Sequence, residues 1–385
     1  MANVLTIASS DADFIDCGVD RSRLANARSV AQAWVESGET TGLVVAAARR
    51  GRIVLHDAFG VLRPDSDTPL SVDAIFPIAS ISKSIVATAI MRLVESGLLG
   101  LNRPVQEYVP EFTGEGRQAV AVWHLLTHTS GLDETDAIEP DSMWFGTESN
   151  AAVIQMICRL PISAPPGSVF SYSSLAYVLL GEIVRRVSGG SPEVFIQRQI
   201  LDPLGMRDTG FSVSESAHSR MALRYSAEER RNSERYASEL ERWIDERAAG
   251  GEGISTARDL LIFGQTFLQG GAYGAARVLS PASVRLMTTP QTGDLPLQFD
   301  DEIWERASWG YGWHVHGSTT GRRGASLYSP STFEYVGMGG AFLWVDPENE
   351  IVGVCLSLLR QGSIGLYPAW RADLLINAIM AAIDV

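Results

Sequence analysis

Hydrophobic and polar positions divide the chain into three parts. Residues 21–37 repeat apolar side chains at helical spacing, which predicts an amphipathic helix. Two β-rich runs follow on either side of Arg50-Gly51 and predict a hairpin. The pattern is then mainly helical, with long loops, as far as about residue 300. Strand character returns from residue 311, and the chain closes with a helical pattern.

Strand-rich ends on both sides of a helical middle predict an α+β fold. We expect an antiparallel sheet built from both termini and flanked by terminal helices, with an inserted, mainly helical domain. The expected boundaries are residues 1–85 and 300–385 for the discontinuous sheet domain and residues 86–299 for the helical domain. The active site would lie between the two. A chain of 385 residues is long enough for two intimately packed domains.

The charge balance narrows the choice of partners. The formal net charge is -14, which argues against nucleic acid or an anionic membrane as partner. The N-terminal stretch lacks the basic start of a secretory signal, and no apolar run approaches the ~20 residues of a membrane span. Three widely separated cysteines form no CxxC pair. We therefore expect a cytoplasmic protein with reduced thiols, and the sequence leaves its oligomeric state open.

One charge-dense segment, residues 226–250, interrupts the helical middle. Such a run of mixed charges is typical of a solvated helix face. A mobile lid beside an active site is the alternative interpretation, and the sequence does not decide between them.

Lys83 is the only lysine among the 31 Lys and Arg residues of the chain. It stands three residues after Ser80, in IASISKS, just before the apolar helix expected over residues 84–100. Residues three apart share one helix face. An apolar setting favours a neutral amine, which arginine cannot supply. Such an amine beside a serine hydroxyl is the arrangement of a nucleophile and its base, although Ser80 could also be a simple N-cap.

Two further stretches could complete such a site. Tyr172 precedes an apolar helix in FSYSSLAY, and a phenol near a lysine can relay a proton to a leaving group. The alternative is that Tyr172 is a packed aromatic and Ser174 an N-cap. The stretch VGMGGAFLWV places Gly339 and Gly340 at a strand start, where backbone amides can approach a ligand closely. A plain bulge would explain these two glycines equally well.

Taken together, these stretches resemble the penicillin-recognising serine hydrolases, the superfamily of DD-peptidases and serine β-lactamases. The nearest branch resembles the class C type, with its esterase and acyltransferase relatives. FPIASISKSIVA is similar to the first motif of this superfamily, and PPGSVFSYSSLAY to the Tyr-x-Asn or Tyr-x-Ser motif. VWHLLTHTSGL, the 250–271 and 277–292 segments and WGYGWHV resemble further landmarks in the same order. The resemblance spans nearly the whole chain.

The resemblance implies a role for each motif residue. Ser80 would be the acyl-accepting nucleophile, Lys83 its base and Tyr172 their partner. The oxyanion hole would consist of the backbone N–H groups of Ser80 and Ala341. This last assignment depends on aligning Met338 and the residues that follow it with the third motif.

Two departures from the family pattern bear on the substrate. The third motif usually begins with Lys or His, whereas Met338-Gly339-Gly340 carries no cation for a substrate carboxylate. An uncharged, soft side chain suits an uncharged acyl or alcohol group. Ser174 stands where β-lactamases usually carry Asn. Both departures favour ester hydrolysis or acyl transfer over β-lactam hydrolysis, and Trp144 and Trp304 are candidates for lining an apolar acyl pocket.

Other motifs point to no cofactor. His124 and His128 have the four-residue spacing of metal ligands, and His314 and His316 alternate on a predicted strand. A third ligand is not evident, so structural roles are favoured for all four. The sequence contains no GxSxG, GxxxxGK or GxGxxG motif.

The sequence therefore predicts a serine hydrolase that acts on small-molecule carboxylic esters through an acyl-enzyme on Ser80, with transfer to a small-molecule acceptor as a close variant. An amidase, peptidase or β-lactamase on the same site is the first alternative. A catalytically silent scaffold that retains the fold is the second.

Overall fold

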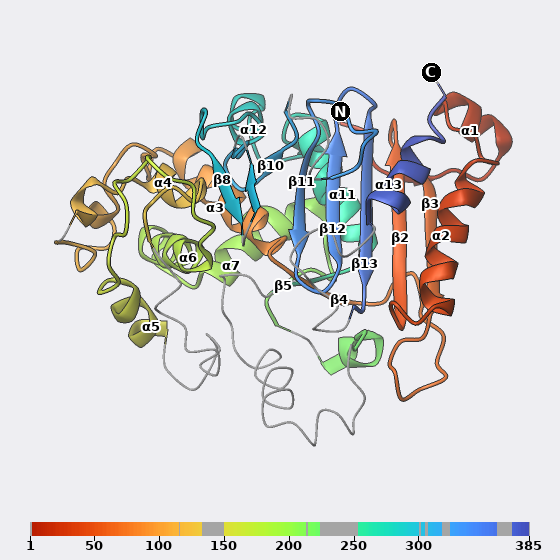
Figure 1. The fold of residues 1–385 in the computed structure, drawn as a ribbon, viewed down its shortest axis with the longest axis horizontal. Helices are drawn as coiled ribbons and strands as arrows, with labels where there is room; N and C mark the ends of the chain where they lie inside the picture. The colour runs from red at the N-terminus through yellow and green to blue at the C-terminus, as the bar shows by residue number, and fades with distance from the viewer. Residues whose placement is uncertain are drawn as a thin grey trace.

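A computed structural model describes residues 2–114, 116–132, 150–212, 215–223, 253–299, 302–304, 307–317, 324–359 and 372–384. Its centre is a seven-stranded sheet in the order β1-β3-β2-β13-β12-β11-β10 (Figure 1). The strands are β1 (Thr6–Ile7), β2 (Gly42–Arg49), β3 (Arg52–Gly60), β10 (His314–Val315), β11 (Phe333–Gly337), β12 (Ala341–Asp346) and β13 (Ile351–Ser357). All neighbours are antiparallel except β1 and β3, which are parallel.

The two ends of the chain meet at the β2–β13 ladder in the middle of the sheet. The register runs from Ile351 opposite Arg49 to Ser357 opposite Leu43. Every residue of β2 is buried, because helices cover both faces of the sheet at this strand. A strand covered on both sides is apolar along its whole length, which explains the run GLVVAAA. The predicted fold class and the prediction of a sheet built from both termini are confirmed.

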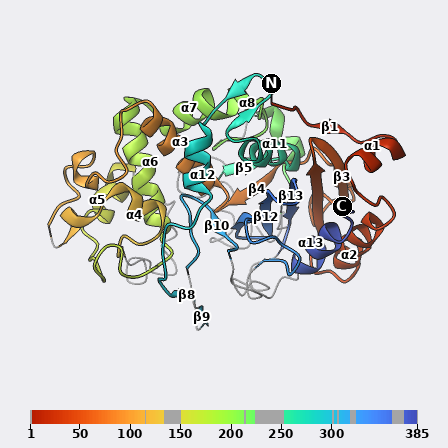
Figure 2. The ribbon, with the colours of Figure 1, turned by 90° about the horizontal axis from the view of Figure 1, so that it is seen from above.

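Terminal helices cover one face of the sheet (Figures 1 and 2). They are α2 (Leu24–Glu36) and α13 (Ala372–Met380), preceded by the short α1 (Asp11–Asp16). Trp34 of α2 and Leu375 of α13 belong to one buried cluster that includes inward-facing side chains of β2, β3 and β13. The predicted amphipathic helix over residues 21–37 and the closing helix are both present.

The opposite face is covered by α11 (Ala257–Leu268), as Figure 2 shows. Its Gly264 approaches the sheet so closely that an added Cβ would lie 2.5 Å from Val352 and 3.1 Å from Val345. The prediction placed this helix in the helical domain of residues 86–299. In the structure α11 packs on β2, β12 and β13.

The helical part lies beyond β10 and β11 (Figure 1). Its helices are α3 (Ser82–Glu95), α4 (Val122–Leu126), α5 (Asn150–Ile157), α6 (Ser174–Ser188), α7 (Pro192–Ile196), α8 (Asp202–Leu204) and α12 (Pro281–Met287). Short two-stranded ladders pair β4 (Phe76–Ala79) with β5 (Gly253–Ser255), β6 (Ala272–Tyr273) with β7 (Ala276–Arg277), and β8 (Leu297–Phe299) with β9 (Glu302–Trp304). One continuous hydrophobic core joins α3 and α6 to the α11 face of the sheet.

Local predictions in this part of the chain also hold. The β2–β3 hairpin turns at Arg50 and Gly51, whose φ angles of 49° and 80° fit a tight turn. The apolar helix predicted from residue 84 begins two residues earlier, as α3, and is followed by Gly97 at φ 71°. Residues 226–250 lie outside the described residues. Of the helices that the structure describes, none is both long and apolar enough to cross a membrane.

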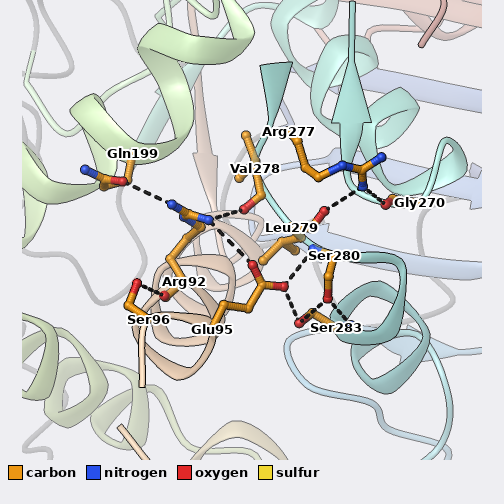
Figure 3. Close-up of polar contacts among 10 residues, drawn as sticks. All are labelled: Arg92, Glu95, Ser96, Gln199, Gly270, Arg277, Val278, Leu279, Ser280 and Ser283. Carbon is orange, nitrogen blue, oxygen red and sulfur yellow. Dashed lines mark hydrogen bonds and ion pairs between the residues drawn. The ribbon is translucent and has the colours of Figure 1, made fainter. Parts of the chain in front are cut away.

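A polar cluster fastens the C-terminal end of α3 to α12 (Figure 3). The Glu95 carboxylate accepts the backbone N–H of Ser280 at 2.7 Å and the hydroxyl of Ser283 at 2.5 Å. Arg92 lies 3.5 Å from the same carboxylate and donates to the carbonyl of Val278 at 3.0 Å. Burial raises the pKa of Glu95, but the hydrogen bonds and Arg92 outweigh it and leave that pKa below its usual value.

We expect Glu95→Gln to lower the free energy of unfolding by about 1–2 kcal/mol at pH 7, because charge-assisted hydrogen bonds are lost. The folded-state pKa of Glu95 is depressed below 4.5, so the difference from wild type should shrink as the pH falls through that pKa. Urea melts at pH 7 and pH 3.5 measure both effects. The control is Glu107→Gln, whose carboxylate is 46% exposed beside Arg103 and should change stability little. Equal effects of the two substitutions would contradict the assignment.

Candidate active site

The turn between β4 and α3 positions Ser80. Ala79 ends the strand with a φ of 43°, in the left-handed region that a residue with a Cβ seldom adopts. The Ile81 N–H donates to the carbonyl of Ile78 at 3.1 Å, and the Lys83 N–H to the carbonyl of Ser80 at 3.0 Å. Ile81 is the N-cap residue, without a side-chain cap. The Ser80 hydroxyl therefore does not cap α3, which removes the simplest alternative to a chemical role.

Two further contacts hold this turn in place. β4 pairs with β5 through Phe76 and Ser255. The Ser82 hydroxyl, fully buried, accepts the backbone N–H of Gly253 at 2.8 Å. The strained backbone at Ala79 is thus held before the turn by β5 and after it by the Ser82 hydrogen bond. Strain at a functional site persists only with such support.

Lys83 lies below Ser80 in the core. Its side chain is only 1% exposed, and its Nζ donates to Ser80 Oγ at 3.1 Å. Nζ also lies 5.2 Å and 5.9 Å from the ring centres of Tyr172 and Tyr177. No carboxylate within the described residues forms an ion pair with it. The amine is therefore held in the core by its hydrogen bond to the Ser80 hydroxyl.

Tyr172 approaches Ser80 from the segment before α6. Its hydroxyl donates to Ser80 Oγ at 2.9 Å. Ser173, not Ser174, caps α6 and accepts the N–H of Ala176 at 3.0 Å. Lys83 and Tyr172, which are far apart in the sequence, therefore both form a hydrogen bond with the Ser80 hydroxyl.

Tyr335 is a site residue that the sequence reasoning missed. It lies on β11, is buried, and its hydroxyl is 3.5 Å from that of Tyr172. Its ring meets the ring of Trp309 edge-on at 5.8 Å. In the sequence FEYVG, Tyr335 looks like an ordinary sheet aromatic. Only the alternation along β11, which places it on the same face as Gly337, could have indicated it.

The predicted third motif has a different place in the structure. Met338, Gly339 and Gly340 form the turn between β11 and β12, and the two glycines have φ angles of 94° and 89°. Met338 is 52% exposed. These glycines meet the steric demands of a turn, and it is the strand before them that reaches the site.

Gly337 makes the close approach that was expected of Gly339 and Gly340. A Cβ added to Gly337 would lie 2.3 Å from the carbonyl oxygen of Ile78, in the turn that carries Ser80. Ala341 pairs with Gly337 on one side and with Leu356 on the other, so it lies in an interior strand. The ladders on both flanks engage the backbone of such a strand. The oxyanion-hole role of Ala341 stays a prediction.

His124 and His128 do not converge on a metal site. Each Nδ1 accepts a backbone N–H, from Ala121 at 2.9 Å and from Ser173 at 3.0 Å respectively. His128 lies beyond the end of α4 with a φ of 57°, so the two residues do not share a helix face. Burial lowers the pKa of His124 to about 4, and burial and Lys83 hold that of His128 well below its usual range. In the described parts of the chain, no three or more His, Cys, Asp or Glu side chains are grouped to hold a metal.

The remaining candidates are two histidines and two tryptophans. His314 pairs with Glu334 at 3.2 Å, and the His316 ring meets the Tyr328 ring edge-on at 5.6 Å. The backbone of Trp304 belongs to β9, but its side chain is outside the described part, as is the whole of Trp144. Neither tryptophan is thereby tested as a pocket residue.

Comparison with known proteins places the chain in a family. The Beta-lactamase family matches residues 27–373. Protein Rv1367c of Mycobacterium tuberculosis (strain ATCC 25618 / H37Rv) is 30% identical over 346 residues, which cover 82% of this chain and 85% of that protein. Esterase EstB of Burkholderia gladioli is 35% identical over 193 residues, which cover 45% of this chain and 48% of EstB.

Solved structures share the fold. A penicillin-binding protein homologue from Caulobacter crescentus matches with a TM-score of 0.76 at 23% identity, over 95% of this chain and 99% of that one. EstCE1, a hydrolase with promiscuous acyltransferase activity, matches with a TM-score of 0.72 at 22% identity over the same shares. The fold and the Ser80 site thus define a serine hydrolase of the β-lactamase and penicillin-binding protein class. The chain belongs to the beta-lactamase family, as the resemblance implied.

The contact between Gly337 and Ile78 predicts a sensitive position. Gly337→Ala should push β11 away from the Ser80 turn, because the new Cβ would meet a backbone oxygen. We expect labelling of Ser80 by a fluorophosphonate probe to slow by roughly 10–100-fold, as displacements of about 1 Å do to aligned groups. Gly190→Ala is the control, since nothing lies within 4 Å of its added Cβ. Unchanged labelling in a folded Gly337→Ala protein would show that β11 does not hold the turn.

Proposed function

We propose that this protein hydrolyses carboxylic esters with uncharged acyl groups through an acyl-enzyme on Ser80. The observation that carries the proposal is the position of Ser80 Oγ, which lies 3.1 Å from a buried amine and 2.9 Å from a phenol. Lys83 provides a base that can lose its proton, and Tyr172 provides a group that can pass one on.

The proposed reaction has two balanced halves. Ser80 Oγ attacks the ester carbonyl while its proton passes to Lys83 Nζ. The tetrahedral intermediate then expels the alcohol, which takes a proton through the Tyr172 hydroxyl, and leaves an acyl group on Ser80. Water then attacks the acyl group on Ser80 and gives up a proton through Tyr172 and Lys83. That proton passes to Ser80 Oγ as the free acid leaves, so the Ser80 hydroxyl is restored. An acceptor alcohol in place of water would give acyl transfer.

The oxyanion would be held by the backbone N–H groups of Ser80 and Met338. The Gly337 carbonyl points toward the β12 side, since it accepts the N–H of Gly340, the residue just before β12, at 3.2 Å. The Gly337 carbonyl and the Met338 N–H belong to the same trans peptide group and so point in opposite directions. The Met338 N–H therefore faces away from β12. Within the described part of the chain, neither of these two N–H groups donates to another protein atom. We therefore propose Met338 for the role that the sequence analysis predicted for Ala341.

The surroundings of Ser80 favour an uncharged substrate. Tyr335 supplies a neutral hydroxyl 3.5 Å from that of Tyr172. Within the described residues, Lys83 is the one basic side chain that forms a hydrogen bond with the Ser80 hydroxyl. Penicillins and peptides with a free C-terminus carry a carboxylate, and nothing described at Ser80 offers it a second charge. Similarity to an esterase, EstB, supports the same substrate class.

A comparison of substrates tests this proposal. p-Nitrophenyl butyrate should give a burst of nitrophenol and a butyryl adduct on Ser80 in the mass spectrum. Its kcat/KM should exceed that for the matching anilide and for a carboxylate-bearing cephalosporin by at least about 100-fold. Ser80→Ala should abolish the burst, whereas Ser29→Ala, the same change at an exposed position on α2, should keep it. Faster turnover of a D-alanyl-D-alanine peptide would favour the peptidase alternative, which the penicillin-binding protein relatives suggest.

The base is tested by a substitution that conserves charge. Lys83→Arg keeps a cation but cannot release its proton near neutral pH. We expect the acylation rate to fall by roughly 10³-fold, within the range found for loss of a general base. Stopped-flow measurement of the nitrophenol burst gives this rate. Circular dichroism at the same temperature controls for folding, and a folded Lys83→Arg enzyme with a normal burst would exclude Lys83 as the base.

A further inference from the structure

His128 contacts the segment around Tyr172 in three ways. Its carbonyl accepts the N–H of Ser171 at 2.8 Å, and its Nδ1 accepts the N–H of Ser173 at 3.0 Å. Its ring stacks on the Tyr172 ring, with centres 4.4 Å apart and planes 25° from parallel. The residues on both sides of Tyr172, and Tyr172 itself, are thus held by one buried imidazole residue.

The backbone at His128 is specialised for this arrangement. Its φ of 57° turns the chain sharply after α4, which directs the carbonyl and the ring to the same short segment. The residue is completely buried. Trp309 lies edge-on to both rings, with its centre 5.3 Å from that of His128 and 6.2 Å from that of Tyr172. The three rings therefore form one contact group, in which His128 touches both Tyr172 and Trp309.

We propose that His128 is a positioning residue, which fixes the Tyr172 hydroxyl at Ser80 Oγ for proton transfer. This inference rests on the proposed function and extends it, since it assigns a role to a residue outside the Ser80, Lys83 and Tyr172 set. Proton transfer requires donor and acceptor to be held within hydrogen-bond distance, here 2.9 Å. A phenol on a loop before a helix needs an external restraint, and the ring and backbone contacts of His128 provide it.

The tautomer of His128 follows from its contacts. Nδ1 accepts the Ser173 N–H, so it carries no proton, and the neutral ring holds its proton on Nε2. Nε2 is buried and has no hydrogen-bond partner within the described residues. A protonated ring would lose the Ser173 bond and would add a cation to the surroundings of Lys83. The ring therefore acts through packing and acceptance of a hydrogen bond, and it does not carry the transferred proton.

His124 offers a matched comparison. It is also a buried histidine whose Nδ1 accepts a backbone N–H, from Ala121 at 2.9 Å. Its ring lies 3.8 Å from the Trp123 ring with the planes tilted by 34°, and among the described residues it makes no ring contact with Tyr172. His124→Asn should therefore cost stability much as a change at His128 does, without a specific effect on the chemistry.

Two substitutions separate the roles of His128. His128→Ala removes both the ring and the acceptor. His128→Asn keeps an acceptor for the Ser173 N–H and tolerates a left-handed φ, because asparagine adopts that region readily. We expect kcat on p-nitrophenyl butyrate to fall by about 100-fold in the alanine variant with KM changed less than about 3-fold, and by about 10-fold in the asparagine variant.

A double-mutant cycle with Tyr172→Phe tests whether His128 acts through the Tyr172 hydroxyl. The rate of Ser80 modification by a fluorophosphonate is measured in both backgrounds. If His128 only positions that hydroxyl, His128→Asn should slow the reaction by about 10-fold in the wild type and less than about 2-fold in Tyr172→Phe. Equal factors in the two backgrounds would overturn the proposal, as would an equal loss of kcat in His124→Asn.

The design separates this inference from the proposed function. Phosphonylation of Ser80 reports the activation of the serine without any assumption about the natural ester. A wild type that is phosphonylated but turns over no ester would contradict the ester substrate, and the cycle would still decide the role of His128. If His128→Ala does not fold, the asparagine variant alone completes the cycle.

Discussion

The burial of the Lys83 amine beside the Ser80 hydroxyl is the constraint on which the site depends. A long polar side chain inside an apolar helix is unfavourable unless its end group is engaged, and here Nζ meets Ser80 Oγ at 3.1 Å with two phenol rings around it. In the proposed mechanism this amine is the group that takes the serine proton. The fold must therefore supply an apolar α3, a rigid turn at its start and a second group, Tyr172, that completes the set.

The sheet supplies the rigidity of that turn. β11 passes so close to the Ile78 carbonyl that only glycine fits at position 337. β11 is in turn fixed by its ladder to β12, and β12 by its ladder to β13, which joins the first part of the chain through β2. The position of Ser80 thus depends on pairing between strands some 300 residues apart in sequence, as between Leu43 and Ser357. Because interior strands cannot slip without turning apolar side chains to the wrong face, this register is strongly specified.

What the sequence could predict depends on how local the determining interaction is. The β2–β3 hairpin, α2, α3 and the spacing of Ser80 and Lys83 follow from neighbouring residues, and all were predicted. Tyr172 was found because it precedes an apolar helix. Tyr335 was missed because only the strand register brings it to Tyr172. The cover by α11 was missed because an apolar helix reads alike whether it packs on a sheet or on other helices.

Met338-Gly339-Gly340 illustrates the same limit in a different way. Paired glycines indicate either a close approach or a turn, and both require the same residue. Here the turn has φ angles of 94° and 89° at Gly339 and Gly340, while a single glycine at position 337 makes the approach. Sequence alone could not separate these two uses, because the distinction depends on which residue faces Ile78.

Backbone strain marks the same site independently. Within the described residues, four non-glycine positions have positive φ: Arg50, Ala79, His128 and Glu350. Arg50 and Glu350 lie at hairpin turns, where the geometry is set by the turn itself. Ala79 instead lies directly before Ser80, and His128 contacts the segment that carries Tyr172. Such strain persists only where the surrounding contacts hold it in place. The Ser80 and Tyr172 hydroxyls, which lie 2.9 Å apart, are therefore each positioned by a strained residue that its neighbours support. The alignment of Ser80 with Tyr172 is therefore built into the backbone before any substrate binds.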